Sequence, residues 1–120
     1  MKHNFKHLNV WKRSRSLVKE VYELSRDFPA EERYGLTSQI RRSAISIPSN
    51  IAEGCGRDSD NQLHHFLGIA IGSNCEVETQ LYLAFDLNLI TEEELETITS
   101  EVMEIRMMLI GFQNRIRPSS

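Results

Sequence analysis

The sequence is poor in residues that interrupt helices or form covalent links. Among 120 residues there are only three prolines, six glycines and two cysteines. Cys55 and Cys75 are twenty positions apart and form no C-x-x-C pair, which predicts two free thiols in a reducing compartment. A chain of this length can bury a sufficient core without disulfides or metal. We therefore predict a single domain over residues 1–120.

Long apolar stretches are also missing. The longest uninterrupted run of apolar residues and glycine covers residues 66–72, far short of the ~20 residues needed to cross a bilayer. The N-terminus has no apolar segment of the kind found in signal peptides. These features predict a soluble, cytoplasmic protein without a membrane partner.

The common catalytic and metal-binding patterns are absent as well. No Glu or Asp is followed three residues later by His, the spacing that di-metal helical bundles use. His3 and His7 lie four apart but have no carboxylate or cysteine partner in register. The glycines of residues 54–57 lack the Lys-Ser/Thr of a phosphate-binding loop, and no G-x-S-x-G motif occurs. The sequence predicts no enzyme, no metal site, no cofactor and no small-molecule substrate.

Four segments carry apolar residues at helical spacing, at about residues 10–28, 33–53, 59–88 and 91–117. No segment shows the period of two that is typical of a strand. Four helices of this length with short connections predict an all-α fold, an antiparallel up-down-up-down four-helix bundle. Pro48 lies inside the second segment, where it removes one backbone donor, and this predicts a kink in that helix.

The ends of these segments carry recognisable signals. Phe28-Pro29 predicts the end of the first helix, and the glycines around Cys55 predict the end of the second. Ser59 with Gln62, and Thr91 with Glu94, have the spacing of a capping box. Pro118 is expected to stop the fourth helix, after Arg115 and Arg117. The fourth segment has a strict 3-4 apolar repeat, which is typical of coiled-coil-like packing; its members are Leu95, Ile98, Val102, Ile105, Leu109, Phe112 and Ile116.

More apolar and small residues are present than one core needs. Met103, Met107 and Ile110 form a second stripe on the fourth segment. Gly68 and Gly72 lie within the third, where each glycine would cost ~1 kcal/mol relative to alanine in an exposed helix. We interpret both features as a self-association surface. The alternative is that they serve the core of the single chain.

The charge is divided along the chain. Residues 1–57 hold eleven Lys/Arg and six Asp/Glu, a balance of +5, whereas residues 58–120 hold three and eleven, a balance of −8, and the two sum to −3. Such a division is typical of a basic binding face, or of complementary halves that meet within or between subunits. The candidate phosphate contacts are Lys12, Arg13, Arg15 and Lys19 on the first segment and Arg41, Arg42 and Arg57 around the second. The alternative is an ordinary solvated face.

Polar residues also lie in register on the second and third segments. Those on the second are Arg42, Ser46, Asn50 and Glu53, and those on the third are Glu76 and Gln80. We interpret them as a hydrogen-bonded network that sets the register of neighbouring helices. A ligand or partner site is the alternative.

Two long motifs carry a family resemblance. The stretches QIRRSAISIPSNIAEGCGR (residues 39–57) and FLGIAIGSNCEVETQL (residues 66–81) resemble the four-helix-bundle family of 23S ribosomal RNA intervening-sequence proteins. The opening LNVWKRSRSLVKEVYELSRDFPAEERYGL is similar to that family's first helix and turn. Eleven positions match the central motif as determinants of fold and assembly: Arg41, Arg42, Asn50, Glu53, Gly54, Gly56, Arg57, Gly72, Ser73, Glu76 and Glu78.

The resemblance implies a function as well as a fold. Members are encoded in insertions within bacterial ribosomal RNA genes, and relatives serve as accessory proteins of diversity-generating retroelements. It implies a homopentameric ring without enzymatic activity, whose partner is RNA, DNA or a nucleic-acid enzyme. We expect a non-catalytic homo-oligomeric binding module of this kind. The alternative is a protein–protein scaffold ring that binds no nucleic acid.

Overall fold

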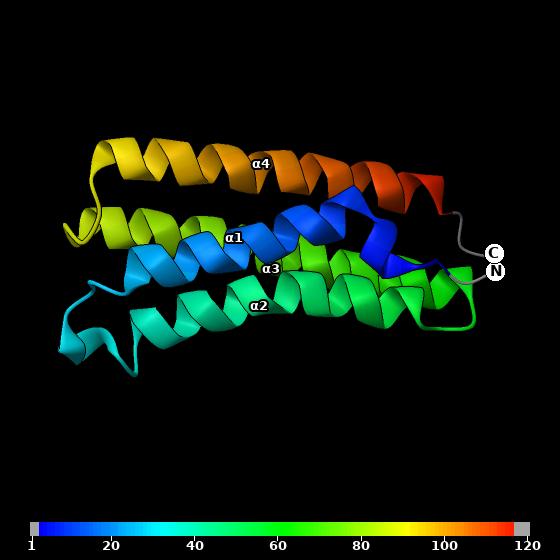
Figure 1. Ribbon diagram of the computed structural model, residues 1–120, viewed down its shortest axis with the longest axis horizontal. Coiled ribbons are helices and arrows are strands. Elements are labelled where there is room, and N and C mark those ends of the chain that lie inside the picture. The colour runs from blue at the N-terminus through cyan, green and yellow to red at the C-terminus, as the bar shows by residue number, and fades with distance from the viewer. Residues whose placement is uncertain (1–2, 117–120) are drawn as a thin grey trace.

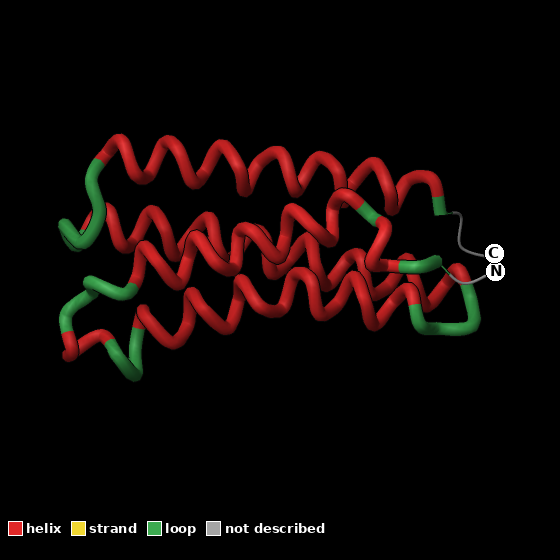
Figure 2. The backbone as a smooth tube through the Cα atoms, viewed as in Figure 1, coloured by secondary structure: helices red, strands yellow, loops and turns green. Residues whose placement is uncertain are grey.

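The structure, a computed structural model, describes residues 3–116, and all of its regular elements are helical. Figure 2 shows long helices joined by short loops. The four α-helices are α1 (Asn9–Ser25), α2 (Leu36–Cys55), α3 (Asp60–Asp86) and α4 (Glu92–Arg115). Two short 3-10 helices, η1 (Phe5–His7) and η2 (Ala30–Glu32), precede α1 and α2. Within the described range, no helix is both long and apolar enough to cross a membrane.

The four helices form a bundle, as predicted. Figure 1 shows successive helices running in opposite directions, so that the start of α1 and the end of α4 lie at the same end of the bundle. Each helix packs on its neighbours in the chain, and α4 closes the bundle by packing on α1. The α2–α3 interface is the most extensive of the four and the α1–α4 interface the least. Helix α2 continues through Pro48, and the kink there stays a prediction.

The apolar stripes meet in one core, as their spacing predicts. Each helix contributes residues of complete burial at three- and four-residue spacing. These include Leu17 and Val21 from α1, Ile40, Ile47 and Ile51 from α2, Leu67, Val77 and Leu81 from α3, and Val102, Ile105 and Leu109 from α4. Both cysteines are free, with Cys55 buried in the core and Cys75 exposed.

The helix boundaries differ from the predicted ones by up to three residues, and α2, for example, ends at Cys55 instead of residue 53. Helix α1 ends at Ser25, and Phe28 beyond it folds back into the core. Helix α2 begins at Leu36 instead of residue 33, because residues 33–35 form a turn that follows η2. Residue 117 and Pro118, expected at the end of the fourth helix, lie outside the described residues.

The end of α3 also differs, since this helix stops at Asp86 rather than residue 88. Asn88 has a φ of 62°, in the left-handed region. The amide of Leu89 donates to the carbonyl of Ala84 at 2.8 Å, and that of Asn88 to Phe85 at 2.9 Å. This is the Schellman arrangement, with asparagine in the place that glycine more often takes.

The predicted caps are present at the starts of α3 and α4. The side chain of Thr91 accepts from the amide of Glu94 at 3.0 Å, and the Glu94 carboxylate accepts from the amide of Thr91 at 2.9 Å. This confirms the capping box of α4. The hydroxyl of Ser59 accepts from the amide of Gln62 at 3.2 Å, so α3 has the side-chain cap but only this half of the predicted capping box.

Gly54 allows the closest approach between α2 and α3. A Cβ atom at this position would lie 2.9 Å from Cβ of Phe66 and 3.0 Å from Cδ1 of Leu63. Such distances require the two helices to move apart. Gly54 is itself inside α2, so its role is to permit this contact, whereas Gly56 is the residue at the C-cap.

We predict that Gly54→Ala lowers the free energy of unfolding by about 1–3 kcal/mol, because overpacking of a tight interface has costs of that size. Urea unfolding followed by circular dichroism measures the change. Gly111→Ala is the matched control, since an added Cβ there meets only a terminal nitrogen of Arg115, at an ordinary contact distance of 3.7 Å. That variant is expected to be neutral or up to about 1 kcal/mol more stable. Equal effects at the two glycines would contradict the assignment.

Candidate nucleic-acid interface

Helix α1 presents a row of positive charges to solvent. Lys12, Arg15 and Lys19 are exposed and share one face of the helix, as their spacing predicts. Arg26, at the C-cap of α1, extends the row by a further seven residues and was missed by the sequence reasoning. None of the four pairs with a carboxylate of the described residues. From Lys12 to Arg26 the row covers about 21 Å at the helical rise of 1.5 Å per residue.

Arg13 lies on a different face of α1 and is not part of this row. Its Nε donates to Glu101 at 3.0 Å, and one terminal nitrogen donates to Glu101 at 2.6 Å and also pairs with Glu104. Hydrogen bonds to these two carboxylates raise the pKa of Arg13 above its usual range. Arg13 therefore joins α1 to α4.

Arg41 and Arg57 are also engaged within the chain. Nε of Arg41 donates to the hydroxyl of Ser25 at 2.8 Å, and its guanidinium lies 4.4 Å from the centre of the Tyr22 ring. Arg57 pairs with Glu53 one helical turn away at 2.8 Å and lies over a ring of α3. Arg42 is exposed on the outer face of α2. The seven predicted cations thus divide into three groups. Lys12, Arg15 and Lys19 lie in the row, and Arg42 is exposed outside it. The other three have polar partners within the chain: Arg13, Arg41 and Arg57.

The predicted polar network is present in a smaller form. The hydroxyls of Ser46 and Ser73 are 2.7 Å apart, and Nδ2 of Asn50 donates to the hydroxyl and the carbonyl of Ser46, both at 2.8 Å. This cluster joins α2 to α3 through Ser73, which the network prediction did not include. Arg42 and Glu76 are exposed, and Glu53 pairs with Arg57. Gln80 keeps a buried Oε1 without a hydrogen bond.

A second polar cluster, at the α3–α4 interface, was not predicted. Asn74 is completely buried, and its Nδ2 donates to the carbonyl of Val102 at 2.9 Å. Nε of Arg106 donates to Oδ1 of Asn74 at 2.7 Å, and the same guanidinium pairs with Glu78. The only sequence signal was Asn74 in an otherwise apolar stripe of the third segment.

The residues predicted for self-association lie at the surface of α3 and α4. Met103 is 42% exposed and Met107 63% exposed, whereas Ile110 is half-buried. An added Cβ on Gly72 would meet nothing within 4 Å, and one on Gly68 would lie 3.3 Å from Nε2 of Gln113. Neither glycine is therefore needed for a close contact between backbones inside the chain. Their part in an oligomer interface stays a prediction.

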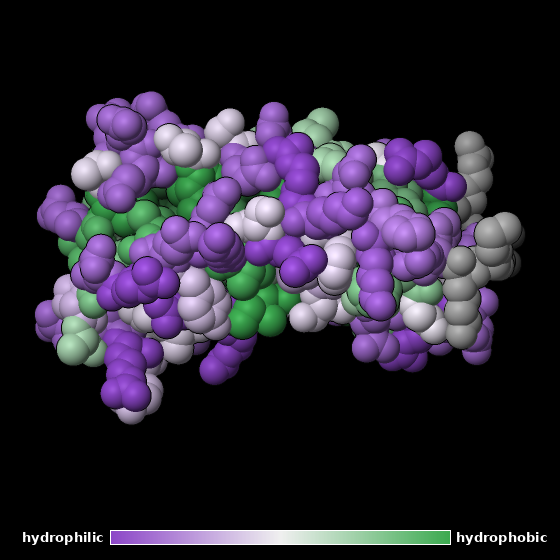
Figure 3. Space-filling model, in the orientation of Figure 1, coloured by the Kyte–Doolittle hydropathy of each residue, from purple (hydrophilic) through white to green (hydrophobic). Residues whose placement is uncertain are grey.

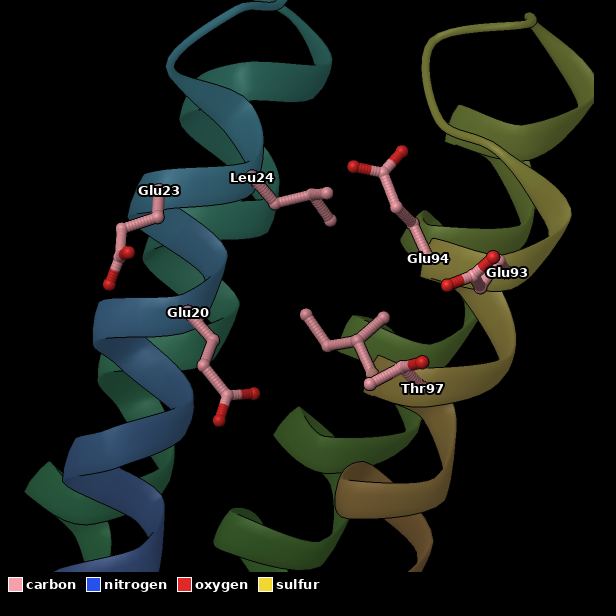
Figure 4. Close-up of a pocket in the computed structure, with 7 residues that line it drawn as sticks. Glu20, Glu23, Leu24, Glu93, Glu94 and Thr97 are labelled. Atoms are coloured by element: carbon pink, nitrogen blue, oxygen red, sulfur yellow. The ribbon is translucent and has the colours of Figure 1, made fainter.

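A groove opens between α1 and α4 at the end of the bundle where these helices separate. It has a volume of about 410 Å³, and its lining combines apolar side chains with four carboxylates. The lining residues are Glu20, Glu23, Leu24, Glu93, Glu94, Thr97 and Ile98. Figure 3 shows apolar surface in the hollow between the two helices. In Figure 4, Glu20, Leu24 and Glu94 point toward the gap, whereas Glu23 lies on the outer side of α1.

Glu20 is the perturbed carboxyl of this groove. Burial raises its pKa, and the charges of Glu101 and Glu23 raise it further, whereas Arg13 opposes the shift. Raising the pKa means that the ionised form is less favourable in the folded state than in the unfolded chain. The groove thus gathers several negative charges, which Arg13 offsets only in part.

Metal ligation has no visible support in the described part of the chain. No three residues of the His, Cys, Asp and Glu types lie close enough together there to hold an ion. The hollows of residues 3–116 are open surface grooves of a few hundred Å³. Fold and surface together define a four-helix-bundle protein whose distinctive features are charged helix faces.

The chain belongs to the family described as 23S rRNA-intervening sequence protein, which matches residues 6–111. This confirms the resemblance carried by the central motifs. The fold is similar to a crystal structure of a protein of unknown function, from the S23 ribosomal protein family, of Bacteroides thetaiotaomicron VPI-5482. The TM-score is 0.81 at 28% identity, over 88% of this chain and 95% of that one. No curated protein matches the chain.

We predict that Arg13→Gln lowers the free energy of unfolding by up to about 1 kcal/mol. The ion pair between Arg13 and Glu101 is partly exposed to solvent, with 37% of the Arg13 side chain accessible. This exposure limits the contribution of the pair to stability. Lys12→Gln, the neighbouring cation of the row, is the control and is expected to change stability by less than about 0.5 kcal/mol. Chemical unfolding at two salt concentrations measures both. Equal stability of the two variants would show that the α1–α4 link contributes nothing.

We also predict that Glu20→Gln stabilises the protein at neutral pH and not at acid pH. The pKa of Glu20 is higher in the folded than in the unfolded state, so its ionisation destabilises the fold as pH rises. The gain should be complete above the raised pKa and disappear below the ordinary one. Unfolding curves from pH 3 to pH 8 would show this, with Glu96→Gln, an exposed carboxylate outside the groove, as control. A loss of stability at neutral pH in Glu20→Gln would contradict it.

Proposed function

We propose that this protein is a non-catalytic, homo-oligomeric binding module, pentameric in the complete assembly, that associates with RNA or DNA in the cytoplasm. The observation that carries the proposal is the exposed row of Lys12, Arg15, Lys19 and Arg26 along α1. A nucleic-acid enzyme would then be recruited through the same nucleic acid.

The row has the dimensions that phosphate binding requires. Duplex DNA carries one phosphate per strand for about every 3.4 Å of its helix axis, so a row of about 21 Å aligned with that axis spans about six phosphates of one strand. Its cations lack partners among the described carboxylates, so binding breaks no ion pair of the fold. Contacts of this kind are sensitive to salt and insensitive to base sequence.

Self-assembly would make a weak row effective. One subunit offers four cations on a chain whose net charge is −3. Several copies that bind one nucleic acid gain affinity from effective concentration, without new kinds of contact. The exposed side chains of Met103 and Met107 and the open surface at Gly72 support an interface between copies.

A second candidate function, a protein scaffold without nucleic-acid binding, is favoured by the acidic start of α4. Three consecutive glutamates, Glu92 to Glu94, are exposed there, and Glu96 follows. A pull-down that recovers a protein partner and no nucleic acid would favour this alternative.

We predict that the wild-type protein binds structured RNA or DNA with micromolar or tighter affinity at low salt. Lys12→Gln/Lys19→Gln should weaken binding for all sequences and lower the slope of log K against log salt by about two, because each lysine that neutralises a phosphate accounts for about one unit. Fluorescence anisotropy over a salt series measures both quantities. Arg15 is kept because its guanidinium lies 5.0 Å from the centre of the Trp11 ring.

The matched control is Lys6→Gln/Arg115→Gln, which removes two exposed positive charges away from the row. Its salt slope should remain that of the wild type. If both variants weakened binding equally, the effect would depend on net charge alone and not on the row. If the wild type did not bind at low salt, the nucleic-acid proposal would be wrong, and the protein scaffold would be the remaining candidate function.

A further inference from the structure

The connection between α1 and α2 carries an exposed aromatic residue beside a cation. Figures 1 and 2 show this turn extending outward at one end of the bundle. Tyr34 is 86% exposed, more than any other large hydrophobic residue described. The guanidinium of Arg33 lies 5.4 Å from the centre of its ring. Tyrosine and arginine are, with tryptophan, the residues that most often dominate the binding energy of protein interfaces.

The acidic α1–α4 groove has the complementary chemistry. Leu24 and Ile98 give it apolar surface, and its lining contains four carboxylates and no lysine or arginine. Neither Glu23 nor Glu93 has an ion-pair partner among the described residues. An occupant that presents an aromatic ring together with guanidinium groups would cover the apolar surface and neutralise the rim.

The turn and the groove lie at the same end of the bundle but on different sides of α1. Tyr34 lies in a hollow with Arg33, Arg42, Ile45 and side chains of the α1–α2 side. The groove lies on the α1–α4 side. Because α1 stands between them, a chain cannot place its own turn in its own groove. A second copy of the chain can.

We propose that the Arg33–Tyr34 turn of one copy inserts into the acidic α1–α4 groove of the next copy. The inference rests on the homo-oligomer proposed above and adds a second contact between copies to the surface at Met103, Met107 and Gly72. The Tyr34 ring covers Leu24 and Ile98, while Arg33 and Arg42 approach Glu20 and Glu93. The contact joins unlike surfaces, so each copy uses its turn on one neighbour and its groove on the other.

The positions of the turn and the groove along the long axis of the bundle favour a closed assembly. Head-to-tail contacts form a ring when the rotation closes and a filament when each step also advances along the axis. Turn and groove lie at one end of the long axis of the bundle (Figure 1). Successive copies therefore join with little axial step, which is the condition for a ring.

Charge reversal of each surface, and then of both, tests this contact. The groove variant is Glu20→Lys/Glu93→Lys, which leaves the Glu94 carboxylate of the capping box in place. The turn variant is Arg33→Glu/Arg42→Glu. Multi-angle light scattering should give a multiple of 13.9 kDa for the wild type and a single subunit mass for each variant. The chain that carries all four substitutions should recover the assembled mass, because every contact then has exchanged signs.

Asp86→Lys/Glu96→Lys, two exposed carboxylates outside the groove, is the matched control and should remain assembled. Circular dichroism establishes that each variant is folded. A groove variant that keeps the assembled mass overturns this contact, and the groove is then a seat for a basic protein partner; the proposed oligomer stands. Failure of the four-substitution chain to reassemble also overturns the pairing. A wild type that stays at 13.9 kDa overturns both the contact and the proposed oligomer.

Discussion

The position of α4 depends on one buried polar side chain. Asn74 is completely enclosed at the α3–α4 interface, and its amide has to be satisfied there because no water reaches it. It donates to the backbone of Val102 and accepts from Arg106. Only one register of α4 against α3 offers both partners. An apolar residue at this place would allow α4 to slide by a turn, whereas the amide makes such a shift costly.

The register of α4 decides what its surface does. With Val102 held against Asn74, Glu101 and Glu104 fall opposite Arg13 and tie α4 to the middle of α1. Toward the start of α4 no comparable link exists among the described residues, and the two helices separate into the acidic groove. The groove and the ion pairs are thus two results of one register.

Helix α1 shows how neighbouring cations acquire different roles. Lys12 and Arg13 are adjacent in the sequence, but successive residues on a helix point about 100° apart. Lys12 therefore joins Arg15 and Lys19 on the solvent side, and Arg13 reaches α4. On α2, Arg41 turns toward α1 while Arg42 stays outside. Charge alone does not separate a binding residue from a structural one.

Periodicity and end signals were sufficient for the local structure. The 3-4 repeats predicted the buried stripes, and the spacing of Thr91 and Glu94 predicted the capping box, because both depend only on residues within a few positions of one another. The central motif was long enough to identify the family. The row on α1 was partly predictable for the same reason, since helical spacing alone places Lys12, Arg15 and Lys19 together.

Tertiary structure decided everything that depends on which helices face each other and at what register. The carboxylate partners of Arg13 are 88 and 91 residues away along the chain. The partners of Asn74 and Ser46 on other helices are 27 to 32 residues away. No local pattern encodes such distances. The acidic groove likewise exists only because α1 and α4 pack least closely of the adjacent pairs. The amino-acid sequence by itself determined four amphipathic helices, their caps and a positive face; packing determined which charges remain free to meet a partner.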